Sequence, residues 1–298
     1  MNNYRFSGHE TFTCKQFWLK KGFDFLQGNE RRFSDESAVV ELGVGKNMVS
    51  SIAYWLKSFG VVDDLFRPTE MGTYILGEQG RDPYIEDIAT VWLLHYFLVK
   101  TEYASVYSLF FNEFKRERID FNRDHLHAFL KRKCFEVSDS LYNENTITSD
   151  VSTFLRNYII SPNLRMAKKL ELDEEFSGLL YELNLFSLYK LEQVEGRQME
   201  MYRAENKNRE ELPYELVLFA ILERFPDQAS ISFRELEVSV NSPGMVFALT
   251  KEGLYAKLEE IVGHYGKQVV LSDTAGIQVL QFKQPINKWE VLNRYYGE

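Results

Sequence analysis

The chain has 298 residues, of which 45% are apolar and 15% aromatic, and its formal net charge is −9. This composition excludes an intrinsically disordered, collagen-like or low-complexity protein. The acidic total argues against a protein that coats nucleic acid non-specifically, because that binding depends on many positive charges. It leaves room for a local basic surface.

The sequence shows no pattern typical of a secretion signal, a membrane span or a cysteine-rich metal site. Residues 1–6 lack the apolar core of a secretory signal, and the most apolar stretch, 88–99, is too short to span a bilayer. Cys14 and Cys134 are far apart and match no metal-binding spacing. We therefore expect a cytoplasmic protein with free thiols and no membrane contact.

Hydrophobic periodicity divides the chain into three parts. We predict a mainly α fold with small β-wings: an N-terminal winged helix-turn-helix domain (1–82), a central helical domain (83–205) and a C-terminal winged-helix-like domain (206–298). Apolar residues at three- and four-residue spacing predict the central helices. These helices cover 85–101, 104–118, 122–134 and 149–160. The polar run 195–211 is typical of a connection or a solvated edge.

The N-terminal part contains a helix-turn-helix pattern. A first helix is predicted to begin near Ser34 and to end at the tight turn 43–45, which has the sequence GVG. A second helix, 46–59, follows and is closed by Gly60. Its apolar residues form one stripe, and its outer face is small, polar and basic, as in a helix that enters the major groove. Residues 61–67 predict a hairpin wing.

We expect this outer face to contact duplex DNA. The predicted contacts are Lys46, Asn47, Ser50, Ser51, Tyr54 and Lys57 on the helix, and Arg67 on the wing. Lysines would hold phosphates, while an asparagine can pair with adenine. Residues 1–60 hold eight Lys/Arg and six Asp/Glu, so they carry +2 and the remaining 238 residues carry −11. The alternative is a winged helix that binds protein rather than DNA.

A second basic stretch lies between residues 115 and 133, where seven Lys and Arg side chains are interrupted by acids. The simpler interpretation is a solvated helix face. If this stretch lies beside the N-terminal domain, it extends the surface available to DNA.

The C-terminal part repeats the winged pattern. A helix over 213–225, a strand over 230–232 and a capping box at Ser232 and Glu235 are followed by a third helix, which runs from Ser242 to about Tyr265. Alternating segments 268–271 and 277–282 predict a hairpin. Because the third helix has a mixed or acidic outer face, we expect this domain to contact protein or to self-associate.

Four motifs carry a resemblance to a known family: residues 6–12 (FSGHETF), 18–22 (WLKKG), 40–49 (VELGVGKNMV) and 54–57 (YWLK). The chain resembles the SspB-type components of bacterial Ssp systems of DNA phosphorothioation. These components work with a cysteine desulfurase, an ATPase and a sulfotransfer-like enzyme, which the resemblance implies as partners. It also implies a magnesium-dependent DNA nickase that prepares one strand for sulfur insertion.

If the chain nicks DNA, the residues expected to act are His9, Glu10 and Glu41, with Glu10 and Glu41 as Mg²⁺ ligands. The plainer interpretation is that His9 and Glu10 cap or pair locally and that Glu41 braces Lys46. The residues themselves show no nuclease motif. The alternatives are therefore a non-catalytic winged-helix adaptor or transcriptional regulator on DNA, or a protein-interaction scaffold. A homo-oligomer is compatible with each.

Overall fold

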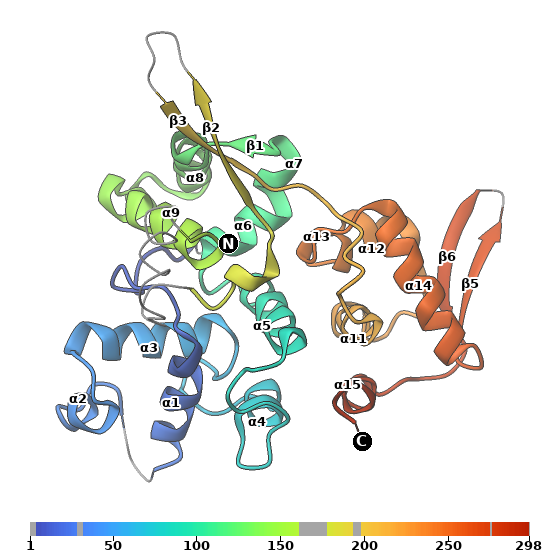
Figure 1. The fold of residues 1–298 in the computed structure, drawn as a ribbon, viewed down its shortest axis with the longest axis horizontal. Coiled ribbons are helices and arrows are strands. Elements are labelled where there is room, and N and C mark those ends of the chain that lie inside the picture. Colours follow the sequence, from blue (N-terminus) through green and yellow to red (C-terminus); the bar gives the residue numbers. More distant parts are fainter. Residues whose placement is uncertain (1–3, 29–31, 161–177, 193–197, 275, 298) are drawn as a thin grey trace. The chain divides into compact units, whose positions relative to one another are not determined.

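The computed structural model describes residues 4–28, 32–160, 178–192, 198–274 and 276–297 (Figure 1). The chain packs into two compact units, Met1–Ala204 and Glu205–Glu298. The fold is mainly α with two small, three-stranded antiparallel sheets, which confirms the predicted fold class. The segments 1–82 and 83–205, expected to form separate domains, pack together in the first unit up to residue 204. None of the helices described is long and apolar enough to cross a membrane.

The first unit begins with α1 (Gln16–Leu26), α2 (Ser37–Leu42), α3 (Lys46–Ser58) and α4 (Glu70–Leu76). Gly43 ends α2 in the left-handed conformation (φ 60°), and its N–H reaches the carbonyls of Val39 and Val40. Helix α3 packs against α1 so closely that a Cβ atom on Gly22 would lie 2.6 Å from Cγ2 of Ile52. The short turn places α2 directly before α3, and α1 packs closely against α3.

A tight turn follows α3. Val62 and Pro68 form an isolated antiparallel bridge, and the Asp63 carboxylate accepts the backbone N–H groups of Leu65 and Arg67 at 2.8 and 2.9 Å. Leu65, at the tip, is 71% exposed. The hairpin predicted over 61–67 is therefore present as a single bridged turn.

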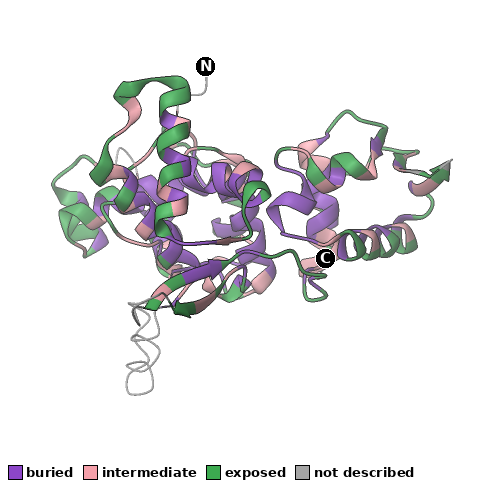
Figure 2. Cartoon of the chain, turned by 90° about the horizontal axis from the view of Figure 1, so that it is seen from above, coloured by how far each residue is buried: buried purple, intermediate pink, exposed green. Residues whose placement is uncertain are grey.

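The helices α5 (Ile88–Lys100), α6 (Ser105–Leu109), α7 (Lys115–Glu117), α8 (Arg123–Val137) and α9 (Glu144–Tyr158) follow. The predicted helix 104–118 is interrupted by a π-helical turn, Phe110–Phe114, whose phenylalanines pack on one another and on α9. Helix α5 is buried on almost every side, which explains its continuous apolar sequence. Figure 2 shows such buried segments in the interior and the exposed ones outside them.

A sheet of three strands, in the order β1-β3-β2, also belongs to the first unit. Strand β1 is Asp120–Phe121, β2 is Ser187–Glu192 and β3 is Gln198–Arg203. The prediction that 195–211 is only a connection or an edge is wrong for β3, which is the central strand of this sheet. Half of its residues are polar, but Met201 and Tyr202 are buried and pair with β2. The sequence is densely apolar from residue 170 to residue 191, and the part of this segment up to residue 177 lies outside the described residues.

The second unit contains α11 (Tyr214–Arg224), β4 (Ser230–Ser232), α12 (Phe233–Val238), α13 (Pro243–Val246), α14 (Lys251–Tyr265), β5 (Val269–Thr274), β6 (Ile277–Phe282) and α15 (Lys288–Tyr296). Its sheet has the order β4-β6-β5. The predicted capping box is present, because Ser232 and Glu235 cap each other reciprocally. The predicted third helix is not continuous: Ala248 has φ 50°, and Thr250 caps a new helix by accepting the N–H of Gly253 at 2.9 Å.

Candidate functional site

The N-terminal end of α3 presents a small polar face. Lys46, Asn47 and Ser50 are exposed. The turn before them is bounded by Gly43 and Gly45, and a Cβ atom on either glycine would meet no atom within 4 Å. Because a helix-turn-helix contacts base edges with the first residues of its second helix, these three side chains lie where such a contact is made.

Two of the predicted DNA contacts lie in the interior instead. Ser51 is fully buried, and its hydroxyl donates to the carbonyl of His9 at 3.0 Å. Tyr54 is 6% exposed, with its ring centre 5.8 Å from that of His9 and 5.6 Å from that of Tyr103. The segment that contains His9 covers this side of α3, so Ser51 and Tyr54 are removed from the proposed DNA-binding face.

Lys57 and Arg67 are tied into the turn after α3. The Lys57 ammonium donates to the carbonyl of Asp64 at 2.9 Å and lies 3.8 Å from the ring centre of Phe66. Partial burial lowers the pKa of Lys57 from its ordinary value. The Arg67 side chain is 72% exposed and pairs with Asp63 at 2.6 Å. Lys57 therefore shapes the turn, whereas Arg67 remains open to solvent.

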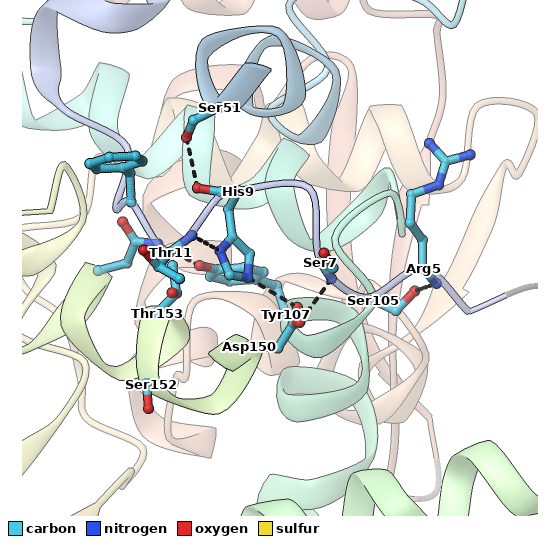
Figure 3. A network of polar contacts seen from close by, with 12 residues as sticks. Arg5, Ser7, His9, Thr11, Ser51, Ser105, Tyr107, Asp150, Ser152 and Thr153 are labelled. Carbon is cyan, nitrogen blue, oxygen red and sulfur yellow. Dashed lines mark hydrogen bonds and ion pairs between the residues drawn. The ribbon is translucent and has the colours of Figure 1, made fainter. Parts of the chain in front are cut away.

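The FSGHETF segment forms a loop with an unusual backbone (Figure 3). Ser7, Gly8, Glu10 and Thr11 all have positive φ, at 72°, 103°, 47° and 66°. Conformations of this kind cost free energy in residues other than glycine and persist where the surroundings hold them. The Ser7 N–H donates to the carboxylate of Asp150 at 2.8 Å, and the Thr11 N–H donates to Nδ1 of His9 at 3.0 Å.

His9 lies beneath this loop and is 3% exposed. Its Nε2 lies 3.5 Å from Oδ1 of Asp150, a carboxylate on α9 that is 1% exposed. The His9 ring is stacked near Trp55 at 6.3 Å between ring centres. Burial raises the pKa of the Tyr54 hydroxyl well above its ordinary value, and the Asp150 charge adds to this, so Tyr54 stays protonated beside the pair. The arrangement is a buried histidine–aspartate pair that holds a strained loop.

The two predicted metal ligands are not assembled into a site. Glu10 and Glu41 are both exposed, Glu10 on the loop and Glu41 on α2. Within the parts of the chain that the structure describes, no three His, Cys, Asp or Glu side chains are grouped so as to hold a metal ion. Since Mg²⁺ bound by protein groups prefers carboxylate oxygens, the residues described do not fit it by themselves.

Asp150 is the functional-site residue that the sequence did not indicate. It lies 141 positions after His9, and its only sequence signal is a carboxylate at a buried position of α9. Charged side chains are rarely buried without a partner, so such a position points to a contact elsewhere in the chain.

Comparisons with known proteins show the family. The family described as "Protein of unknown function (DUF4007)" matches residues 6–296, and the chain belongs to it. A search of curated protein sequences found no significant match. Two solved structures are similar to the chain, a crystal structure of SspB and one of magnesium ion-bound SspB. For each, the TM-score is 0.82 and the identity 26%, over 99% of this chain and 88% of that one.

These matches confirm the SspB-type resemblance predicted from the sequence. They also support the expectation that the protein is a component of an Ssp system. The magnesium ion is reported for the similar protein and not for this chain.

Proposed function

We propose that the protein is the component of an Ssp phosphorothioation system that binds duplex DNA, and that it nicks one strand for sulfur insertion. The observation that carries the DNA-binding part is the exposure of Lys46, Asn47 and Ser50 at the beginning of α3, directly after the Gly43 turn. The major groove admits one α-helix, and short polar side chains reach base edges without steric conflict.

The distribution of charge supports the same surface. Residues 1–60 carry +2 in a chain of net charge −9. The acidic remainder disfavours broad contact with phosphates outside local basic sites, so association is expected to be directed mainly to residues 1–60. Arg67, exposed on the turn after α3, is paired with Asp63, so it offers hydrogen-bond donors to this surface but no net charge.

Duplex binding measured by fluorescence anisotropy tests the proposal. The double variant Lys46→Ala, Asn47→Ala is expected to lose at least about tenfold in affinity, since one phosphate contact and one base contact are removed. Lys21→Ala, an exposed lysine on α1, is the control and is expected to bind nearly as the unchanged protein does. Equal affinity of the double variant and the control would contradict the proposed surface.

Nicking is the catalytic part of the proposal, and it rests on the SspB likeness, including the magnesium ion-bound SspB structure. Supercoiled plasmid incubated with the protein and Mg²⁺ should be converted to the open circular form. Glu10→Ala and Glu41→Ala should slow this conversion, while Glu78→Ala, an exposed control, should not. His9 is expected to act through its hold on the loop, because it is buried.

A second candidate function is a non-catalytic adaptor or transcriptional regulator on DNA. It is favoured by one observation: the described residues supply no group of three metal ligands. The adaptor binds duplex DNA in the same way but leaves supercoiled plasmid intact with Mg²⁺. The plasmid assay therefore separates the two functions.

The second unit is proposed to serve protein partners. The exposed face of α14 carries Glu252, Glu259 and Glu260 against one lysine, Lys251. An acidic helix is poorly suited to phosphates, and it suits a basic surface of another Ssp protein or of a second copy of the chain. The cysteine desulfurase, the ATPase and the sulfotransfer-like enzyme are the proposed partners, in the cytoplasm. Co-purification of these partners with the unchanged protein and with a variant in which Glu252, Glu259 and Glu260 are changed to lysine tests whether the acidic face of α14 binds them.

A further inference from the structure

Two arginines of the first unit converge on one residue. Nη1 of Arg123, at the beginning of α8, donates to the hydroxyl of Ser152 at 3.0 Å. Nε of Arg156, on α9, donates to the carbonyl of the same Ser152 at 3.4 Å. Because both contacts end on one residue, the two guanidinium groups are close neighbours. Both arginines are exposed to solvent.

Neither arginine forms an ion pair with any carboxylate that the structure describes. Their neighbours on α8 behave differently, since Arg132 pairs with Glu117 at 2.5 Å and Lys133 pairs with Glu113 at 2.9 Å. Partial burial lowers the pKa of Arg156, and the positive charge of Arg123 lowers it further. Two neighbouring cations without an anion repel each other, and a bound anion would relieve that repulsion.

The arginine pair is joined to the FSGHETF loop. Nη2 of Arg156 donates to the carbonyl of Thr11 at 2.5 Å and to the hydroxyl of Thr153 at 3.1 Å. Thr11 and Glu10 are exposed residues of that loop, and both have positive φ. An anion held by the two arginines therefore lies next to the strained part of the loop. Nη1 of Arg156 makes no hydrogen bond within the described residues and remains available as a donor.

We propose that Arg123 and Arg156 form a phosphate-binding site for the backbone of a nucleic acid strand, which the structure places beside Glu10 and Thr11. Planar guanidinium groups bind phosphate oxygens with paired hydrogen bonds, and two of them offer enough donors for both free oxygens of one phosphodiester, whose single negative charge offsets part of their repulsion. The site rests on the proposed function, because it is a second contact with the same DNA. Of the basic stretch 115–133, only Arg123 takes part in this phosphate contact.

The first arm of the test uses DNA. Duplex affinity is measured over a range of salt concentrations for the unchanged full chain, for Arg123→Gln and for Arg123→Gln, Arg156→Gln. Loss of this one phosphate contact is expected to reduce the slope of log affinity against log salt by about 1 and the affinity several-fold. Arg132→Gln, on the same helix but paired with Glu117, is the matched control and should leave the slope unchanged. Arg123→Gln leaves the Thr11 contact intact, so it remains informative if the double variant fails to fold.

The second arm uses inorganic pyrophosphate as the probe. The unchanged protein and Arg132→Gln should be stabilised against thermal unfolding by millimolar pyrophosphate, and the Arg123 variants should respond less. If the folded Arg123 variant has the same salt slope as the unchanged protein, the arginines do not bind the DNA strand and the proposal is overturned. If, in that case, pyrophosphate still stabilises the unchanged protein more than the variant, the arginines bind a free phosphate instead. If Lys46→Ala, Asn47→Ala loses DNA but the arginine variants do not, the proposed function stands and this inference fails. If the unchanged chain binds no DNA, the proposed function fails and the strand site fails with it.

Discussion

At the scale of single residues, Gly8 shows how closely the FSGHETF loop is fitted to α3. Its φ is 103°, and a Cβ atom at this position would lie 2.6 Å from Cδ2 of Tyr54. Tyr54 is buried among His9, Trp55 and Tyr103, so its ring has little room to move. Glycine is needed here for its conformation and for the space it leaves.

We predict that Gly8→Ala lowers the free energy of unfolding by about 1–3 kcal/mol, because it adds backbone strain and a steric clash. Urea denaturation at neutral pH measures the change. Gly263→Ala is the control, since Gly263 lies within α14 and a Cβ atom there meets nothing within 4 Å. That variant should be neutral or more stable by about 0.5–1 kcal/mol. A Gly8 variant as stable as the control would show that the loop is not fixed against Tyr54.

Asp150 carries the second residue-scale prediction. Its carboxylate accepts the Ser7 N–H and lies 3.5 Å from Nε2 of His9, and it is almost fully buried. Asp150→Asn removes the negative charge that faces His9, and the amide is a weaker hydrogen-bond acceptor for Nε2 of His9 than the carboxylate. We therefore expect the free energy of unfolding to fall by about 1–3 kcal/mol. Trypsin should also cleave faster after Arg5, which is exposed at the start of the loop.

Asp227→Asn, at an exposed turn in the second unit, provides the control for Asp150. It makes the same chemical change without a buried partner and should alter neither stability nor cleavage after Arg5. Unchanged cleavage in the Asp150 variant would mean that the aspartate does not hold the loop.

The candidate site was predictable from the sequence only in part. The motif around His9 and the polar beginning of α3 are local, so their spacing indicates them. Asp150, Arg123 and Arg156 reach the loop only through the packing of α8 and α9, and no short-range pattern reports that packing. Burial of Ser51 and Tyr54 has the same origin, since the loop that covers them lies about 40 residues earlier in the chain.

At the scale of elements, the beginnings of two helices follow directly from their local caps. Ser232 and Asn122 each form a capping box, and both helices begin directly after these residues. The misses have physical causes. Strand β3 is stabilised by pairing with β1 and β2 rather than by its own composition. The break between α13 and α14 depends on the left-handed conformation of Ala248. Because this residue is not a glycine, the sequence does not indicate the break.

The pair Asp120–Arg203 joins the edge strand β1 to β3, with Nε of Arg203 2.8 Å from Oδ1 of Asp120. Hydrogen bonds from Arg203, and then from Tyr189, lower the pKa of Asp120 from its ordinary value. A carboxyl group whose pKa is lowered by folding stabilises the fold above its unfolded pKa, about 3.9 for Asp. That contribution is lost as the pH falls through the lower, folded pKa.

We therefore predict that Asp120→Asn lowers the urea midpoint at neutral pH and that the difference from the unchanged protein shrinks in acid. The comparison is made at neutral pH and below the folded pKa of Asp120. Asp124→Asn, an exposed aspartate on α8, serves as the charge-matched control. A difference that stays constant with pH would contradict an electrostatic origin and indicate a loss of packing instead.

At the scale of the whole molecule, the −9 charge is unevenly distributed. Residues 1–60 are slightly positive, and the remaining 238 residues carry −11. The first unit holds the exposed beginning of α3, the FSGHETF loop and the Arg123–Arg156 pair, whereas the second unit has an acidic helix face on α14. The net charges of the two units are similar, −5 for residues 1–204 and −4 for residues 205–298, so it is these local surfaces that favour DNA contact by the first unit and protein contact by the second.

Hydrogen exchange of the full chain with and without duplex DNA tests the central claim most directly. Amides that a bound duplex shields exchange more slowly, so the measurement reports which segments of the chain it contacts. We predict new protection in α2 and α3, residues 37–58, and in the turn that carries Arg67, with further protection near Thr11 and the beginning of α8. Protection confined to residues 205–298, or none anywhere at moderate salt, would contradict it.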